Sequence, residues 1–491
     1  MVKNMSNLLL KNKTILKNSI LPMLSLVTLL VGILLNNYYI LFISVLLIYI
    51  SLIIDCLKDW KKKILLLAFL LAIFLFILGN PTITILLGKE FNKIYSKENI
   101  NFGFYCLYAS LFGLFISNFL HDYKNIKYKK DKDFFRFSFD INFIKKVVIL
   151  PILALSGMSL LLLGIEEIVF ISNHTYVDFY AKFSSQLPIF IRMFVQFWLI
   201  SVCFYLATKP KMKNAVLILC INLLLNVPSF IVGMRSPLMI NVAFMLIYIT
   251  IRYIQANKKF NIKFIIVGVC LVPILMVGLS VYGSSRNGKI NGDVFEEPIT
   301  KFLIDQGHMF DIIADSKDLL PSLPNNGLIN YVIGPVYDTV TNNPITRKIF
   351  GIPNIGNQNE TTLKYSHNMK MQLSFLFYGD DFFNGLGVGT SYILETYVTF
   401  GYLGILLWSM LIAFFCNYAN WSLKYPSKLV CNGILLLVLS QYLYTPRANA
   451  LLPFIQINHI IAYIIMLYLA QFIKNKLLKR KDMCKSNGHK E

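Results

Sequence analysis

Apolar runs long enough to cross a membrane recur along this chain, and short polar connections separate them. A spanning helix needs about 20 predominantly apolar residues. By that measure the pattern predicts twelve spans, near residues 19–35, 38–55, 64–79, 101–119, 146–170, 188–207, 214–233, 237–254, 263–282, 397–417, 429–445 and 453–473. The predicted fold is an all-α polytopic integral membrane protein of about 12 transmembrane helices, with one large, partly helical extracytoplasmic loop.

The long connection after the ninth predicted span divides the chain into four parts. Residues 1–282 carry transmembrane helices 1–9, and residues 283–396 form the large loop. Residues 397–473 carry transmembrane helices 10–12, and residues 474–491 form a basic tail. Connections inside compact domains run to about 2–6 residues, so a loop of this length indicates a functional segment.

Charge sorts the connections between the two sides of the membrane. The lysine-rich ones all fall on one side of a twelve-helix arrangement, together with both termini: they are the N-terminus and residues 58–63, 124–146, 209–213, 258–263, 424–428 and 474–485. Basic connections lie in the cytoplasm, so we expect a multi-pass plasma (inner) membrane protein with both termini cytoplasmic. The 283–396 loop falls on the other side, and its twelve acidic and eight basic side chains fit an exported segment.

Composition supports the membrane assignment and excludes several functions. Hydrophobic residues make up 56% of the chain and charged residues 15%, against about 25% charged in soluble proteins. The net charge of +22 follows from the cytoplasmic lysines, and no basic domain with interleaved aromatics indicates nucleic-acid binding. None of the eight cysteines lies in the long loop or forms a CxxC pair, which argues against a disulfide framework and structural zinc. We expect no metal and no cofactor.

Within the long loop, residues 298–315 have the periodicity of an amphipathic helix. One face collects Ile299, Phe302, Leu303, Met309, Phe310 and Ile313. The pattern predicts a helix that lies in the membrane interface, is kinked at Gly307 and ends before Lys317. Residues 321–357 hold five prolines and many asparagines, which predicts turns.

Arginine is distributed differently from lysine. The chain has eight arginines against 39 lysines, and five arginines fall on the predicted outer side or at its helix ends: Arg192, Arg235, Arg286, Arg347 and Arg447. A guanidinium binds phosphate through two parallel hydrogen bonds, so this distribution indicates an anionic ligand. The alternative is that each arginine snorkels or pairs with a loop carboxylate. We favour function for Arg235 and Arg447, because each lies in a turn too short to offer a nearby structural partner.

The motifs that the chain lacks leave a reaction on a pre-activated substrate as the expected chemistry. The chain has no Walker A loop, Rossmann glycine fingerprint, HExxH or GxSxG motif. Nucleotides are not expected outside the cell, whereas a lipid diphosphate can react there. Its departure creates negative charge that nearby cations would stabilise, and Arg235, Arg286 and Arg447 are the candidates.

A base is also needed for the attacking hydroxyl group. His308, His367 and Glu395 are the candidates on the outer side. The polar sequence around His367 favours it slightly. The competing interpretation is a solvent-facing imidazole for either histidine, and a structural pair with an arginine for Glu395.

Three short motifs carry a resemblance to a known family. They are the segment from Gly387 to Gly404 (GVGTSYILETYVTFGYLG), the turn from Gly233 to Arg235 and the Gln306–His308 element. Together with the layout of the spans, they resemble the O-antigen or capsular polysaccharide polymerase (Wzy) family. The resemblance implies that polyprenyl-diphosphate-linked oligosaccharide repeat units, carried on a lipid such as undecaprenyl diphosphate, are joined at the outer face of the plasma membrane. Expected partners are that substrate, membrane lipid, a chain-length regulator and a flippase.

Two other functions stay open. The lipid A–O-antigen ligases are related in architecture to this family, so the chain could transfer a finished glycan instead of extending one. A flippase or transporter of lipid-linked oligosaccharide is the second alternative. Transporters often show two related halves and ionisable groups at mid-membrane. Here the loop divides the predicted spans nine to three, without a visible repeat, and this favours an enzyme.

Overall fold

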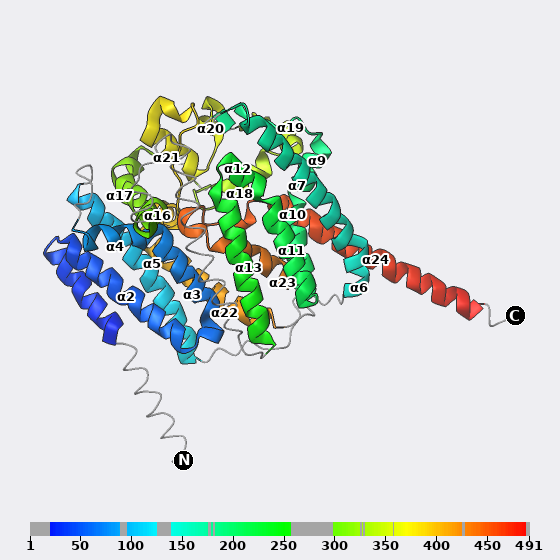
Figure 1. The fold of residues 1–491 in the computed structure, drawn as a ribbon, viewed down its shortest axis with the longest axis horizontal. Coiled ribbons are helices and arrows are strands. Elements are labelled where there is room, and N and C mark those ends of the chain that lie inside the picture. Colours follow the sequence, from blue (N-terminus) through cyan, green and yellow to red (C-terminus); the bar gives the residue numbers. More distant parts are fainter. Residues whose placement is uncertain are drawn as a thin grey trace, which may run out of the picture.

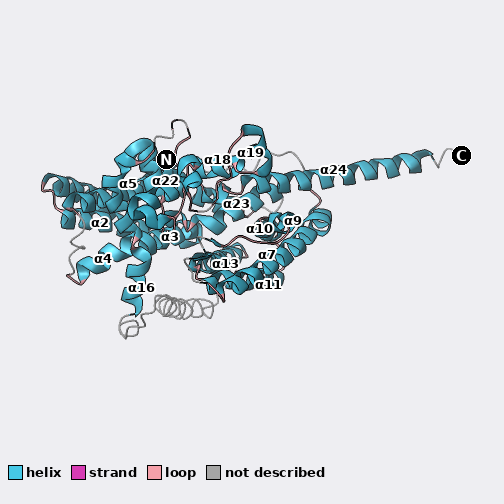
Figure 2. Cartoon of the chain, turned by 90° about the horizontal axis from the view of Figure 1, so that it is seen from above, coloured by secondary structure: helices cyan, strands magenta, loops and turns pink. Residues whose placement is uncertain are grey.

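The computed structural model describes residues 20–88, 96–124, 139–174, 178–179, 182–256, 298–324, 327, 329–356, 358–424 and 428–487. Throughout these ranges the regular elements are helices (Figure 2). The all-α prediction is therefore confirmed.

Among the described residues, nine helical segments are long and apolar enough to cross a membrane. They are Tyr38–Lys58, Trp60–Leu86, Lys97–Asp122, Ile141–Ile171, Ile189–Ala207, Met212–Val232, Ser236–Gln255, Tyr392–Ser422 and Ile457–Leu478. Two shorter apolar helices, Ile20–Leu34 and Leu429–Tyr442, also coincide with predicted spans. The remaining predicted span, 263–282, lies outside the described residues. The chain is a multi-pass membrane protein.

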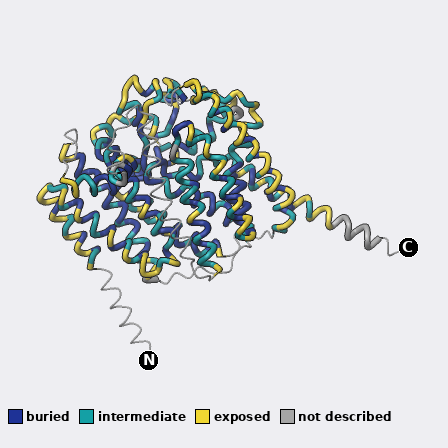
Figure 3. The backbone as a smooth tube through the Cα atoms, in the orientation of Figure 1, coloured by how far each residue is buried: buried dark blue, intermediate teal, exposed yellow. Residues whose placement is uncertain are grey.

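The helices pack around a central pair formed by α5 (Lys97–Lys124) and α22 (Tyr392–Ser422). Helix α22 also lies along α3 (Trp60–Ile73), while α10 (Phe197–Ala207) lies along α23 (Leu429–Tyr442). The α5–α22 contact is close because a Cβ atom at Gly113 would lie 2.4 Å from the Leu406 carbonyl oxygen. Buried backbone lies along the inside of the bundle, and exposed backbone lies around its outside (Figure 3). Leucine, isoleucine and valine side chains are exposed along these outer helix faces, as lipid contact requires.

The described residues between α13 (Arg235–Gln255) and α22, from Pro298 onward, fold into short helices at one end of the bundle (Figure 1). These helices are α16 (Pro298–Gly307), α17 (Met309–Leu319), α18 (Gly334–Thr341), α19 (Pro344–Phe350), α20 (Glu360–Tyr365) and α21 (Met369–Tyr378). The prediction of turns over residues 321–357 is therefore wrong for α18 and α19. Each of these two helices begins at or next to a proline, the position where proline fits a helix.

The predicted amphipathic helix is interrupted close to the expected residue. Helix α16 ends at Gly307, and α17 begins at Met309. The expected end before Lys317 is wrong, because Lys317 Nζ bonds to Glu98 Oε2 at 2.7 Å and the helix continues to Leu319. The apolar face is covered by protein: Phe310 is buried beside Gly103 of α5. The predicted apolar face of this helix therefore packs on the bundle, and its position at the membrane interface stays a prediction.

Candidate functional site

Arg447 lies where three parts of the chain meet. It ends a short 3-10 turn, Thr445–Arg447, that follows α23. One guanidinium nitrogen donates to Gln306 Oε1 at 2.7 Å, and the guanidinium carbon lies 5.9 Å from the centre of the Phe76 ring. The expectation that Arg447 lacks a structural partner is therefore wrong. The contacts with Gln306 and Phe76 orient the half-buried Arg447 side chain. The Gln306 side chain is a neutral amide, so this hydrogen bond does not neutralise the positive charge of Arg447.

The turn that precedes Arg235 is short and contains a glycine with positive φ. Helix α12 (Val227–Val232) ends at Gly233, whose φ of 110° is open to glycine and costly for other residues. Helix α13 begins at Arg235. The hydroxyl groups of Ser236 and Tyr444 lie 2.7 Å apart, which joins the start of α13 to the turn that carries Arg447. The position of the Arg235 side chain lies outside the described atoms.

His308 is the single residue between α16 and α17. The break is tight, since a Cβ atom at Gly307 would lie 2.7 Å from the backbone nitrogen of Asn80. His308 Nδ1 lies 2.9 Å from the Asp305 carbonyl oxygen. Burial, reinforced by the positive charge of Arg447, lowers the pKa of His308 below its usual value. The protein environment therefore disfavours the charged form of this imidazole.

A carboxyl group that was not predicted as part of the site lies one helical turn after His308. Asn80 Nδ2 donates to Asp311 Oδ2 at 2.8 Å. Burial raises the pKa of Asp311 to about 7, and the nearby Asp315 adds to the increase. Asp311 can therefore gain or lose a proton near neutral pH.

Glu395 lies in the first turn of α22 and is fully buried. Its Oε1 atom accepts from Asn449 Nδ2 at 2.6 Å, and its Oε2 atom accepts from the Ala450 backbone nitrogen at 2.8 Å. Both donors follow Arg447 closely in the chain. The carboxylate therefore ties the start of α22 to the segment that carries Arg447, and this arrangement favours a positioning role over a role as base.

His367 has an acidic partner. Its Nδ1 atom lies 2.9 Å from Asp338 Oδ1, while Asp338 Oδ2 accepts from Ser366 Oγ at 2.7 Å and from the His367 backbone nitrogen at 2.8 Å. Gly334 permits the approach, because a Cβ atom there would lie 2.2 Å from the His367 carbonyl oxygen. The His367 side chain is 25% exposed. With Nδ1 directed at Asp338, the Nε2 atom remains for a substrate.

One asparagine side chain joins the two halves of this arrangement. Asn449 Nδ2 lies 2.6 Å from Glu395 Oε1 and 3.1 Å from Asn368 Oδ1. Asn368 follows His367 and caps α21, where its Oδ1 atom accepts from the Lys370 backbone nitrogen. We define the site cluster as His308, Asp338, His367, Glu395, Arg447 and Asn449.

The other predicted arginines are placed differently. Arg192 is exposed on α9 (Ile189–Val195), and Arg286 lies outside the described residues. Arg347 lies on α19, and its Nε atom is buried without a hydrogen-bond partner among the described residues. Among the described residues, no hydrogen bond joins Arg192 or Arg347 to the site cluster.

Two glycines of the Gly387–Gly404 segment have clear structural roles. A Cβ atom at Gly389 would lie 3.0 Å from Met309 Cε and 3.6 Å from the Arg447 carbonyl oxygen, so glycine lets the chain pass close to both. Gly401 has a φ of 63° and breaks α22 internally. Gly389 therefore shapes the backbone beside the cluster, and Gly401 shapes α22.

Sequence reasoning missed Asp338, Asp311 and Asn449. Asp338 is 29 residues from His367, so spacing alone gives no signal of their contact. Asn449 had a usable signal, because a polar residue in a short turn between two spans needs a partner. Among the described residues, no group of three or more His, Cys, Asp or Glu side chains could hold a metal ion.

The chain matches the model of a known protein family. The family model described as O-antigen polysaccharide polymerase Wzy matches residues 18–481, nearly the whole chain. Comparisons with curated proteins and with solved structures give no match.

Proposed function

The chain belongs to the O-antigen polysaccharide polymerase Wzy family, and we propose that it extends a surface polysaccharide, O-antigen or capsule, from polyprenyl-diphosphate-linked repeat units. The reaction takes place at the outer face of the plasma membrane, with both termini in the cytoplasm. Membership of the family supports the polymerase role. The position of the short helices at one end of the bundle, together with the acidic loop, supports the outer face.

The observation that carries the proposal is the position of Arg447. Its guanidinium bonds to Gln306 of α16, next to the α16–α17 break that carries His308. The turn that carries Arg447 is joined to the start of α13 through Tyr444 and Ser236. A helix N-terminus presents free N–H groups to an anion, and Arg235 is the first residue of α13. We assign Arg447 and Arg235 to the diphosphate, with Arg286 as a third candidate. Arg192 and Arg347 remain proposals of lower rank, since their described positions are separate from the cluster.

The proposed reaction is a direct glycosyl transfer. A hydroxyl group of the acceptor sugar attacks the anomeric carbon of the donor, a new C–O bond forms, and the bond to the diphosphate breaks. The electron pair leaves with the lipid diphosphate, whose charge the arginines stabilise. The hydroxyl proton passes to His367 Nε2, while Asp338 holds the other ring nitrogen. His308 is the second candidate base, and Glu395 positions the Arg447 segment.

Reconstitution with a synthetic lipid-diphosphate repeat unit tests this function. The purified protein in liposomes should convert the substrate into a ladder of polymers on a gel. A single transfer to a different acceptor would instead indicate a ligase. Movement of the intact lipid between leaflets without chain growth would indicate a flippase, and either of these two results would overturn the polymerase assignment.

A further inference from the structure

Tyr444 connects the two segments that carry the proposed diphosphate cations. It lies between α23 and the Thr445–Arg447 turn, and its carbonyl oxygen accepts from the Arg447 backbone nitrogen at 2.8 Å. Its hydroxyl group lies 2.7 Å from Ser236 Oγ, in the first turn of α13. Arg235 is the residue before Ser236. A single residue therefore connects the backbone at Arg447 with the backbone at Arg235.

The Tyr444 ring is held by an aromatic side chain that also contacts Arg447. The rings of Phe76 and Tyr444 meet edge to face, with their centres 5.6 Å apart. The Arg447 guanidinium carbon lies 5.9 Å from the centre of the same Phe76 ring. Phe76 is buried in a five-residue π-helical stretch, Phe74–Leu78, and such stretches are frequent at functional sites. The Phe76 ring thus orients both Tyr444 and Arg447.

The start of α13 has a second set of hydrogen bonds. Asn241 Nδ2 donates to the Pro237 carbonyl oxygen at 2.8 Å, and Asn241 Oδ1 accepts from Asn222 Nδ2 at 2.8 Å. Asn222 Oδ1 in turn accepts from Trp198 Nε1 at 2.8 Å. These three side chains are buried within membrane-spanning segments, where an unpaired polar group is costly. The first turn of α13 is therefore held firmly within the bundle.

Two cations at a fixed separation can distinguish a diphosphate from a monophosphate. A diphosphate presents two phosphoryl groups, so each cation binds one of them. A monophosphate meets only one of the two cations at a time. The second cation adds most to this discrimination when its position is fixed before the ligand binds, because ordering it on binding costs conformational entropy. The contacts of Tyr444 supply that fixed separation.

We propose that the Tyr444–Ser236 hydrogen bond sets the separation between Arg447 and the start of α13, and that this separation makes the site select an isoprenoid diphosphate over an isoprenoid monophosphate. Tyr444 is then a positioning residue, which acts through the two arginines. The proposal rests on the diphosphate assignment made above for Arg447 and Arg235. It adds the residues that determine which lipid carrier the site accepts.

Farnesyl diphosphate and farnesyl monophosphate, two short isoprenoid probes, test this selection. Each is titrated into the purified full-length protein in detergent, and its dissociation constant is measured by calorimetry. The wild type should bind the diphosphate at least about tenfold more tightly, the contribution of one charge-assisted hydrogen bond. Equal affinity of the wild type for the two probes would overturn the proposal together with the diphosphate assignment.

Tyr444→Phe removes only the hydroxyl group and keeps the ring that contacts Phe76. This variant should lose most of the preference for the diphosphate, while its affinity for the monophosphate should stay the same. A full preference in Tyr444→Phe would overturn the proposal and leave the diphosphate assignment intact. An equal loss of affinity for both probes would also overturn the proposal, since that result indicates a general structural defect.

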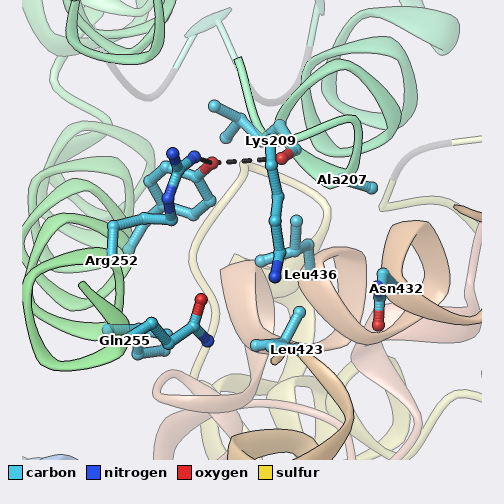
Figure 4. Close-up of a pocket in the computed structure, with 10 residues that line it drawn as sticks. Ala207, Lys209, Arg252, Gln255, Leu423, Asn432 and Leu436 are labelled. Carbon is cyan, nitrogen blue, oxygen red and sulfur yellow. Dashed lines mark hydrogen bonds between the residues drawn. The ribbon is translucent and has the colours of Figure 1, made fainter. Parts of the chain in front are cut away.

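Two further variants locate the effect in this hydrogen bond. Ser236→Ala removes its other half and should act like Tyr444→Phe. Because both variants break one interaction, the double variant should lose no more preference than either single variant, and additive losses would overturn the proposal. Tyr248→Phe is the matched control toward the other end of α13, where the Tyr248 hydroxyl accepts from Arg252 Nη1 at 2.8 Å and donates to the Leu206 carbonyl oxygen at 3.0 Å (Figure 4). This control should keep the wild-type preference, and a loss as large as that of Tyr444→Phe would overturn the proposal.

Discussion

Asp338→Asn separates the chemical role of the His367–Asp338 pair from its structural role. Asparagine has the same shape as aspartate, but its side chain carries one oxygen and one nitrogen in place of two oxygens. That oxygen can replace Asp338 Oδ2, which accepts from Ser366 Oγ and from the His367 backbone nitrogen. The amide nitrogen then faces His367 Nδ1, which lies 2.9 Å from Oδ1 in the native pair. Because an amide nitrogen only donates, Nδ1 must accept, and the imidazole proton moves to Nε2.

A neutral His367 with its proton on Nε2 cannot accept a second proton at that atom. A well-placed general base contributes about 10²–10⁴-fold to the rate, so kcat for chain extension should fall by that amount. KM for the lipid-linked donor should not change, because the substitution leaves the arginines in place. One hydrogen bond is altered, so the free energy of unfolding should fall by only about 0.5–1.5 kcal/mol.

The assay is the initial rate of polymer formation in liposomes, measured at several donor concentrations. Asp380→Asn is the matched control, because Asp380 is exposed in the same loop and the substitution makes the same change in charge. Its kcat should equal that of the wild type. A wild-type kcat in Asp338→Asn would refute the role of His367 as base, and a large rise in KM alone would assign the pair to substrate binding.

Four further predictions follow from the site. Arg235→Ala should abolish long-chain polysaccharide while the protein remains inserted, and normal chain lengths on a gel would contradict the diphosphate assignment. Glu395→Ala should leave the donors of Asn449 and Ala450 without an acceptor and lower the unfolding free energy by about 1–3 kcal/mol for each group, as a thermal melt in detergent would measure. Gly307→Ala should lower the melting temperature, since its Cβ atom would lie 2.7 Å from a backbone nitrogen. Burial raises the pKa of Asp311 to about 7, so the folded state keeps a proton that the unfolded state loses near pH 4; stability should fall as the pH rises between these values, and Asp311→Asn should remove that fall.

The fold could be predicted to a large extent because spans depend on a local property of the chain. Twenty apolar residues bury themselves in lipid whatever the rest of the protein does, so the predicted spans that fall within the described ranges coincide with helices. The position at which α17 ends does not follow from such a local property of the sequence. Lys317 appeared to interrupt the apolar face, but its ammonium group reaches Glu98, a partner more than two hundred residues away.

The sequence indicates the arginines and histidines of the candidate site, but not the acidic and amide groups that hold them. Arginine in short outer turns stands out because a cation there needs a ligand or a partner. The choice between these two depends on tertiary contacts: Arg447 has Gln306 as a partner, and no spacing rule indicates that pair. Asp338 and Asn449 were missed for the same reason, since their roles arise from hydrogen bonds across distant segments.

These hydrogen bonds also explain why a buried glutamate stands at the end of the long loop. The proposed base and the proposed diphosphate cations come from segments that are separate in the chain, and a displacement of about 1 Å can cost about 10²-fold in rate. Glu395 fixes the segment after Arg447 through Asn449 and Ala450, while Asn449 also reaches Asn368, the neighbour of His367. A buried carboxylate is costly unless both of its oxygens are paired, so each partner is held strongly in place. The geometry of the proposed site is therefore set where α22, the loop and the turn after α23 meet, and Gly389 lets these backbones approach.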